Sequence, residues 1–170
     1  MEEIFNRRSV RKFQDRPVED EKIDKLLHAA MQAPSAGNQQ PWEFIVIKDK
    51  AVLSKLSLMT PYSKPAEGSA VTFILVANCK DLRHPTFWQQ DMSAALQNIL
   101  LEAVHLELGA VWMGVATNES AEKYLIEMYQ FPEFIKPFAL VSVGYPDNQK
   151  NEFVDRFKPE RVHYETWSNK

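Results

Sequence analysis

The stretch DMSAALQNILLEAVHLEL, residues 91–108, decides how this chain of 170 residues folds. Its apolar residues recur at helical spacing and leave only a narrow polar stripe, which predicts a helix at the centre of the fold. These residues are Met92, Ala95, Leu96, Ile99, Leu100, Ala103, Val104 and Leu106. The helix is either the core helix of a monomer or one whose outer surface a second subunit covers. Gly109 follows it and is expected to cap its C-terminal end.

Short apolar segments on both sides of this helix predict the strands of a sheet. WEFIVI at 42–47 and VTFILV at 71–76 are runs of strand length, rich in β-branched and aromatic residues, as is typical of buried strands. The remaining predictions are a strand at 138–144, a strand or extended turn at 110–115, and helices at about 19–31 and 120–129. No linker or repeat separates these elements, which indicates one mixed α and β domain over residues 1–170.

Composition excludes several classes of protein. A net charge of −3 and an isoelectric point near 5.8 do not fit a nucleic-acid-binding protein, which would present a basic surface. The single cysteine, Cys79, excludes an intrachain disulfide, and the four histidines are too scattered for a metal site. The chain has neither eighteen consecutive apolar residues nor a leader-like start. We therefore expect a soluble, cytoplasmic protein that binds neither membrane nor nucleic acid.

A cluster of cations near the N-terminus predicts an anion site. The run RRSVRKF at 7–13 contains Arg7, Arg8, Ser9 and Arg11. Guanidinium groups bind phosphate bidentately, and a serine hydroxyl adds a further donor. In an extended segment Arg7, Ser9 and Arg11 would project to one face and Arg8 to the other. The alternative is a solvated basic stretch balanced by nearby carboxylates.

A second unusual segment is PSAGNQQPW at 34–42, between a predicted helix and a predicted strand. Ser35, Asn38 and Gln39 can exchange hydrogen bonds with the edge of a flat heteroaromatic ring, and Ala36 and Gly37 permit close backbone approach. The alternative is a structural turn with Asn38 in the left-handed conformation.

Two later segments carry weaker signals. In the first, Gly114 can expose a backbone N–H to a ligand beside Trp112 and Met113, although the same residues also suit a core strand. The second is DRFKPERVHYETW at 155–167, in which Arg161 would complete a phosphate site if the tail folded back. Exposed ion pairs within the tail are the alternative. Glycine-rich nucleotide loops and the GxSxG elbow are absent from the sequence.

Taken in order, these segments resemble the nitroreductase-like flavoprotein family over nearly the whole chain. The residues that carry the resemblance are RRSVRKF, APSAGNQQPWEFIVI, DMSAALQNILLEAVHLELGAVWMGV, VSVGYP and DRFKPERVHYETW. It implies an α+β fold in which helices flank a central, mostly antiparallel sheet. It also implies an intertwined homodimer with two FMN sites at the subunit interface, and a tail of about 147–170 that docks on the dimer.

The resemblance assigns the FMN site to both subunits. One subunit would supply the arginine cluster and the other the loop at 34–39, while Met113 and Gly114 would place a backbone N–H near flavin N5. Arg11 would favour the reduced flavin, Lys64 would lie near the ring, and Arg161 would reach the phosphate. The complete expected set is Arg7, Arg8, Ser9, Arg11, Pro34, Ser35, Ala36, Asn38, Gln39, Lys64, Met113, Gly114 and Arg161.

The function implied by the resemblance is an FMN-dependent oxidoreductase with ping-pong hydride transfer. NADH or NADPH would reduce the flavin, and a nitroaromatic, a quinone or a related small electron-poor molecule would then reoxidise it. No catalytic side chain is expected. Two alternatives are a flavin-binding, redox-responsive protein without turnover and specialised flavin chemistry such as reductive dehalogenation.

Overall fold

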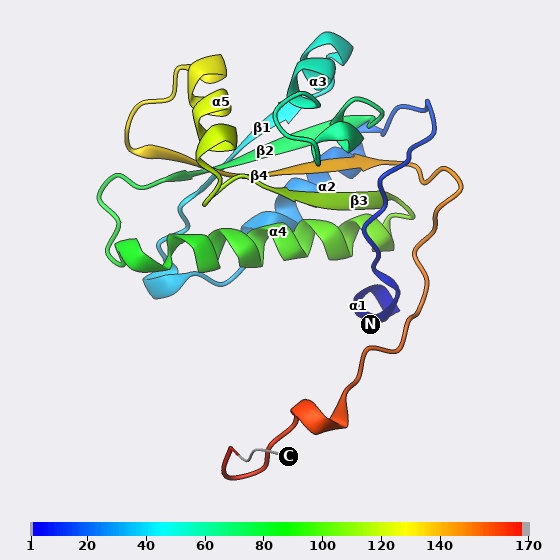
Figure 1. Ribbon diagram of the computed structural model, residues 1–170, viewed down its shortest axis with the longest axis vertical. Coiled ribbons are helices and arrows are strands. Elements are labelled where there is room, and N and C mark those ends of the chain that lie inside the picture. The colour runs from blue at the N-terminus through cyan, green and yellow to red at the C-terminus, as the bar shows by residue number, and fades with distance from the viewer. Residues whose placement is uncertain (1, 168–170) are drawn as a thin grey trace.

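The protein is built around one four-stranded sheet (Figure 1). The computed structural model describes residues 2–167. The strands lie in the order β1-β2-β4-β3, and all three pairings are antiparallel. The expected antiparallel sheet is therefore confirmed. The strands are β1 (Trp42–Ile47), β2 (Val71–Asn78), β3 (Gly109–Gly114) and β4 (Ile135–Gly144).

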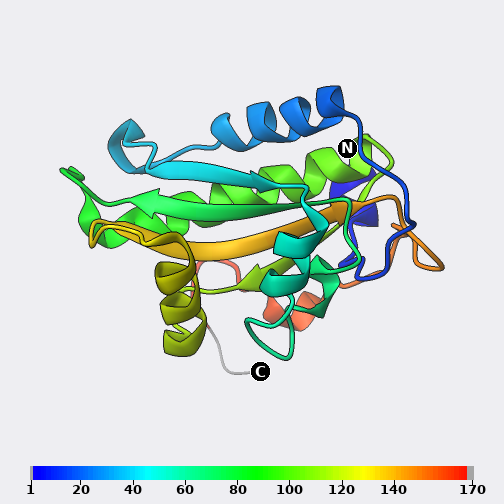
Figure 2. The ribbon, with the colours of Figure 1, turned by 90° about the horizontal axis from the view of Figure 1, so that it is seen from above.

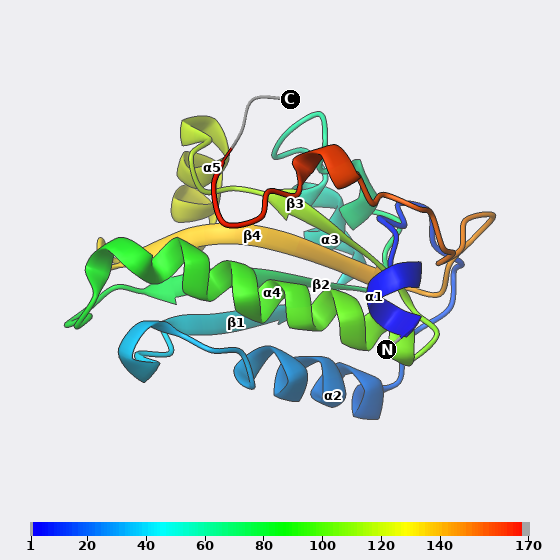
Figure 3. The ribbon, with the colours of Figure 1, turned by 90° about the horizontal axis from the view of Figure 1, so that it is seen from below.

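Helices cover both faces of this sheet (Figures 2 and 3). One face carries α2 (Asp20–Met31) and α4 (Trp88–His105), whose apolar side chains form the larger core cluster. The other face carries α3 (Lys50–Leu56) and α5 (Glu119–Tyr129), which contribute to a second cluster. A short helix, α1 (Glu2–Asn6), contacts α4.

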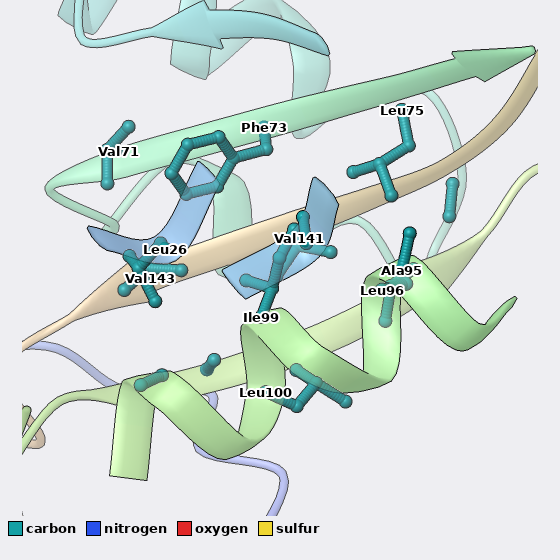
Figure 4. Close-up of a cluster of buried hydrophobic side chains, with 14 of the residues drawn as sticks. Leu26, Val71, Phe73, Leu75, Ala95, Leu96, Ile99, Leu100, Val141 and Val143 are labelled. Atoms are coloured by element: carbon teal, nitrogen blue, oxygen red, sulfur yellow. The ribbon is translucent and has the colours of Figure 1, made fainter. Parts of the chain in front are cut away.

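The positions of the two core clusters explain why the central strands are continuous apolar segments in the sequence. In Figure 4, Phe73 of β2 and Val141 of β4 lie over Ile99 of α4. Their neighbours Ile74 and Leu140 belong to the cluster on the opposite face. The central strands are thus buried on both faces, which requires continuous apolar runs instead of alternation. The helix predicted at 91–108 is central, as expected.

Helix α4 does not end as predicted. It stops at His105, and Glu107 adopts the left-handed conformation with φ of 61°. Bonds from Leu108 N–H to Ala103 O (2.7 Å) and from Glu107 N–H to Val104 O (3.0 Å) close the end in a Schellman motif. The cap predicted at Gly109 is therefore wrong, because this residue already begins β3.

The C-terminal segment leaves the body of the protein as an extended arm (Figure 1). Its four aromatic side chains, Phe153, Phe157, Tyr164 and Trp167, are between 60% and 82% exposed. Phe153 still contacts the ring of Phe5, with centroids 6.3 Å apart. The docking of the arm on a dimer stays a prediction. Within residues 2–167, no helix has the length and apolarity needed to cross a membrane.

Candidate functional site

The arginine cluster lies along the start of β3. Val10 donates its N–H to Ala110 O (3.0 Å), Ser9 forms a parallel bridge with Ala110, and Val10 is buried. Glycine is required at Gly109, because an added Cβ would lie 2.6 Å from a methyl carbon of Val10. The side chain of Val10 thus fixes the cluster to the sheet.

The arginines of the cluster line two different cavities. Arg7 still belongs to the last turn of α1, since its N–H donates to Glu3 O (3.0 Å). It lines a different cavity from Ser9 and Arg11. Arg8 lines the same cavity as Ser9 and Arg11. Because Arg7 is part of a helical turn, the alternation expected for an extended segment does not apply to it, and the direction of the Arg8 side chain stays a prediction.

The first cavity, which we name the arginine hollow, has a volume of about 490 Å³. Its lining residues are Arg8, Ser9, Val10, Arg11, Gln149, Lys150, Glu152 and Arg156. Arg7 lies in the adjoining cavity, which Arg156 also lines. Burial lowers the pKa of Arg7, and the charges of Arg156 and Arg8 lower it further. Guanidinium groups that repel one another in this way favour an anion between them.

The second cavity, the strand-edge hollow, has a volume of about 550 Å³, which is within the usual range for small-molecule sites. Its lining residues are Arg11, Lys12, Thr60, Pro61, Tyr62, Lys64, Pro65, Val111, Trp112, Met113, Gly114 and Asn118. Arg11 lines both hollows. Four expected FMN residues, Arg11, Lys64, Met113 and Gly114, therefore share one cavity.

Gly114 leaves space for a ligand at the edge of the sheet. A Cβ built on it would meet no atom within 4 Å, so packing within the chain does not explain the glycine. Because Gly114 also lines the strand-edge hollow, its open backbone would permit a ligand in that hollow to approach closely. Together, the open strand edge and the arginine hollow fit a ligand with a flat body and an anionic end, as FMN has.

The loop at 34–42 is held in shape by Asp91 of α4. Gly37, Asn38 and Gln40 have φ values of 55°, 56° and 46°. Asn38 thus has the left-handed conformation of the alternative interpretation, in which the segment is a structural turn. The buried Asp91 carboxylate accepts from Ala36 N–H (2.8 Å) and from Gln39 Nε2 (2.7 Å).

The side chain of Gln39 supports the loop from within. Its Oε1 accepts from His84 N–H (2.9 Å), and its Nε2 donates to His84 O (3.1 Å) as well as to Asp91. Ser35 Oγ likewise accepts from Gln40 N–H (3.0 Å). Both polar atoms of the Gln39 amide are thus engaged inside the protein, and its expected contact with FMN stays a prediction.

This loop and the arginine cluster lie at opposite ends of α4 (Figure 3). Asp91 holds the loop, while His105 Nδ1 lies 3.2 Å from a carboxylate oxygen of Glu3, just before the cluster. Fourteen residues of α-helix separate Asp91 from His105, a rise of about 21 Å. One chain therefore does not bring the two expected halves of the FMN site together.

Two arginines of the tail lie at different places. Arg161 belongs to the short helix η4 (Pro159–Arg161) on the extended arm and lines neither hollow of its own chain, so its contact with the phosphate stays a prediction. Arg156 lines the arginine hollow. The sequence showed both arginines but not the path of the arm. No group of three or more His, Cys, Asp or Glu residues between 2 and 167 could hold a metal ion.

Comparisons with known proteins agree with this geometry. Residues 4–145 match the Nitroreductase family. A relative from Archaeoglobus fulgidus, provisionally named NADH dehydrogenase/NAD(P)H nitroreductase, is 44% identical over 96% of both chains. A structure from Clostridium acetobutylicum, provisionally named NADH oxidase, superposes with a TM-score of 0.96 at 49% identity, covering 97% of this chain and 99% of the other.

The name of a third similar protein includes a cofactor. An FMN-dependent nitroreductase from Clostridium difficile superposes with a TM-score of 0.89 at 31% identity. The match covers 98% of this chain and 100% of that one. The family match over residues 4–145 and the 44% identical relative show that this chain belongs to the Nitroreductase family.

Proposed function

We propose that this protein is an NAD(P)H-dependent FMN oxidoreductase that reduces small electron-poor molecules such as nitroaromatics or quinones. The observation that carries the proposal is the junction of the two hollows at Arg11. The arginine hollow suits the phosphate of FMN, and the strand-edge hollow suits its ring. The names of the relatives, which include an FMN-dependent nitroreductase, support the same activity.

The residues at the junction would hold and orient the cofactor. Arg8, Ser9, Arg11 and Arg156 would bind the phosphate, and Arg11 lies where the two hollows meet. Lys64, whose ammonium lies 3.9 Å from Glu67, also lines the strand-edge hollow. When bound, FMN would supply the hydride chemistry, accepting from the nicotinamide and donating to the substrate. Gly114 would leave the ring edge open to both.

The proposal includes a homodimer. About 21 Å of helix separates the loop at 34–42 from the arginine cluster, so one FMN cannot contact both segments of the same chain. Two copies related by a twofold axis would bring the loop of one subunit to the cluster of the other. The exposed aromatic arm gives each copy a segment with which to hold its partner.

An absorbance spectrum of the purified protein, followed by anaerobic addition of NADH or NADPH, tests this function. We expect flavin bands that bleach on addition of at least one nucleotide and return when a nitroaromatic or quinone is added. Flavin that stays oxidised would contradict the oxidoreductase and favour a binding protein without turnover. Failure to bind FMN after reconstitution would overturn the site itself.

A further inference from the structure

The backbone of the arginine cluster is held by two side chains from the start of the arm. Gln149 Oε1 accepts from the N–H groups of Arg11 (2.7 Å) and Lys12 (3.0 Å). Asn151 Oδ1 accepts from Arg8 N–H (3.2 Å), and its Nδ2 donates to Leu108 O (2.9 Å). We name these two residues the amide clamp. Asn151 thereby joins three segments, which are the cluster, the arm and the residue just before β3.

The clamp lies just beyond the residues at which the N-terminal segment and the arm pair through their backbones. Gln14 N–H donates to Tyr145 O (2.9 Å) and Asp147 N–H donates to Lys12 O (3.0 Å), which forms an isolated antiparallel bridge between Phe13 and Pro146. Beyond Asp147 this pairing stops. Side-chain amides at alternate positions of the arm then provide the acceptors.

The clamp affects how an anion can be bound. The N–H groups of Arg8, Val10, Arg11 and Lys12 are all engaged, two of them by Gln149, one by Asn151 and one by Ala110. At these four positions only side chains remain to bind an anion. Their direction depends on the backbone that the clamp fixes, and the same stretch of arm carries Arg156 into the hollow.

We propose that Gln149 and Asn151 are positioning residues that hold Arg8, Arg11 and Arg156 around one anion, the phosphate of the cofactor. This inference rests on the proposed function, because it takes FMN as the ligand. Asn151 does not line the arginine hollow, so it acts on the anion only through the backbone it holds. Neither residue lines the strand-edge hollow.

Comparing the affinities of FMN and riboflavin isolates the phosphate, because riboflavin lacks that group. Flavin fluorescence titrations would measure both affinities for the full-length wild-type chain and for Gln149→Met and Asn151→Leu. We expect each substitution to reduce the ratio of FMN affinity to riboflavin affinity by roughly fivefold, the equivalent of one hydrogen bond. Riboflavin affinity should stay the same.

Gln14→Met provides the matched control. Gln14 Nε2 donates to Pro146 O (2.8 Å), so it also joins the N-terminal segment to the arm through an amide, but it lies outside the arginine hollow. We expect the ratio of FMN affinity to riboflavin affinity in Gln14→Met to equal that of the wild type. If the clamp variants lost affinity for FMN and riboflavin equally, or kept the wild-type ratio of the two affinities, the positioning role would be overturned. A wild-type protein that binds neither flavin would instead overturn the proposed function.

Discussion

The buried carboxylate of Asp91 accepts a 2.7 Å hydrogen bond from the side-chain amide of Gln39, 52 residues away in the sequence. The orientation of that amide is fixed, because its oxygen accepts from His84 N–H and its nitrogen donates to His84 O. Ala36 N–H donates to the other oxygen of Asp91. Asp91 must therefore present two acceptors, which only the carboxylate provides.

We expect Asp91→Asn to destabilise the protein. The new amide group would face one of the two donors, leaving a buried N–H without an acceptor at a cost of about 1–3 kcal/mol. Denaturant unfolding would measure the loss. Asp24→Asn, which removes the same charge from an exposed position of α2, should have almost no effect. Equal stability of the two variants would contradict the role of Asp91.

Two glycines of β3 should respond to alanine in opposite ways. At Gly109 the added methyl group would overlap Val10 at 2.6 Å, so Gly109→Ala should cost about 1–3 kcal/mol in unfolding free energy. At Gly114 the methyl group meets no atom, so Gly114→Ala should fold normally. It should nevertheless weaken FMN binding, because the methyl group enters the strand-edge hollow.

Gly68→Ala is the control for this pair. Gly68 also has open space around the position of an added Cβ, but it lines neither hollow. It should change neither stability nor FMN affinity. Equal FMN affinity in Gly114→Ala and Gly68→Ala would show that the ring does not lie against Gly114.

Arg156 and Arg161 allow a direct test of which tail residue binds the phosphate. Because Arg156 lines the arginine hollow, Arg156→Ala should remove a charge-assisted contact worth about 1.5–3 kcal/mol of FMN affinity. Arg161→Ala should weaken binding only if the arm of one subunit reaches the site of another. Isothermal titration of both variants with FMN decides between the two residues, and full affinity in Arg156→Ala would exclude it.

The pH dependence of stability should include a contribution from Glu19. Its carboxylate accepts from Tyr145 Oη at 2.7 Å, and this hydrogen bond lowers the pKa of Glu19 below the ordinary value of 4.5. The unfolded chain therefore takes up a proton first as the pH falls. The stabilisation from this hydrogen bond is fully present above about pH 4.5. It is lost as the pH falls through the pKa of Glu19 in the folded protein.

Tyr145→Phe tests this contribution, because it removes the hydroxyl and keeps the ring over which the Arg16 guanidinium lies at 3.6 Å. Melting temperatures measured between neutral pH and about pH 3.5 should fall less steeply for the variant than for the wild type. Parallel curves for the two proteins would show that the hydrogen bond from Tyr145 to Glu19 does not contribute.

Local patterns were enough to predict the main elements but not the contacts that shape the site. The predicted strand at 42–47 coincides with β1, and the helix at 120–129 differs from α5 by one residue, because burial leaves a clear apolar pattern. Helix α3 was missed, since its seven residues bury only Leu53 and Leu56. A local signal for this helix in the sequence is Asp49, whose side chain accepts from Val52 N–H and caps the N-terminal end.

The site residues that sequence reasoning missed have partners far away in the chain. Asp91 appears in the sequence as one polar residue near the start of an amphipathic helix, and nothing local links it to the loop at 34–42. Gln149 and Asn151 resemble ordinary residues of a polar tail. Their roles depend on tertiary contacts spanning 43 to 143 residues, which no periodicity encodes.

The exposed arm leads to the last prediction. Phe157, Tyr164 and Trp167 are each more than 70% exposed, and a second copy of the chain would remove this apolar surface from water. Deleting the chain after Arg156 keeps the arginine hollow and removes all three rings. The truncated protein should remain folded, because its core clusters contain no residue beyond Tyr145.

Light scattering after size-exclusion chromatography should give a dimer for the full chain and a monomer for the truncated one. FMN binding should fall with the loss of the dimer, because the loop of the second subunit is then absent. A truncated protein that stays dimeric and retains FMN would show that the arm does not hold the subunits together.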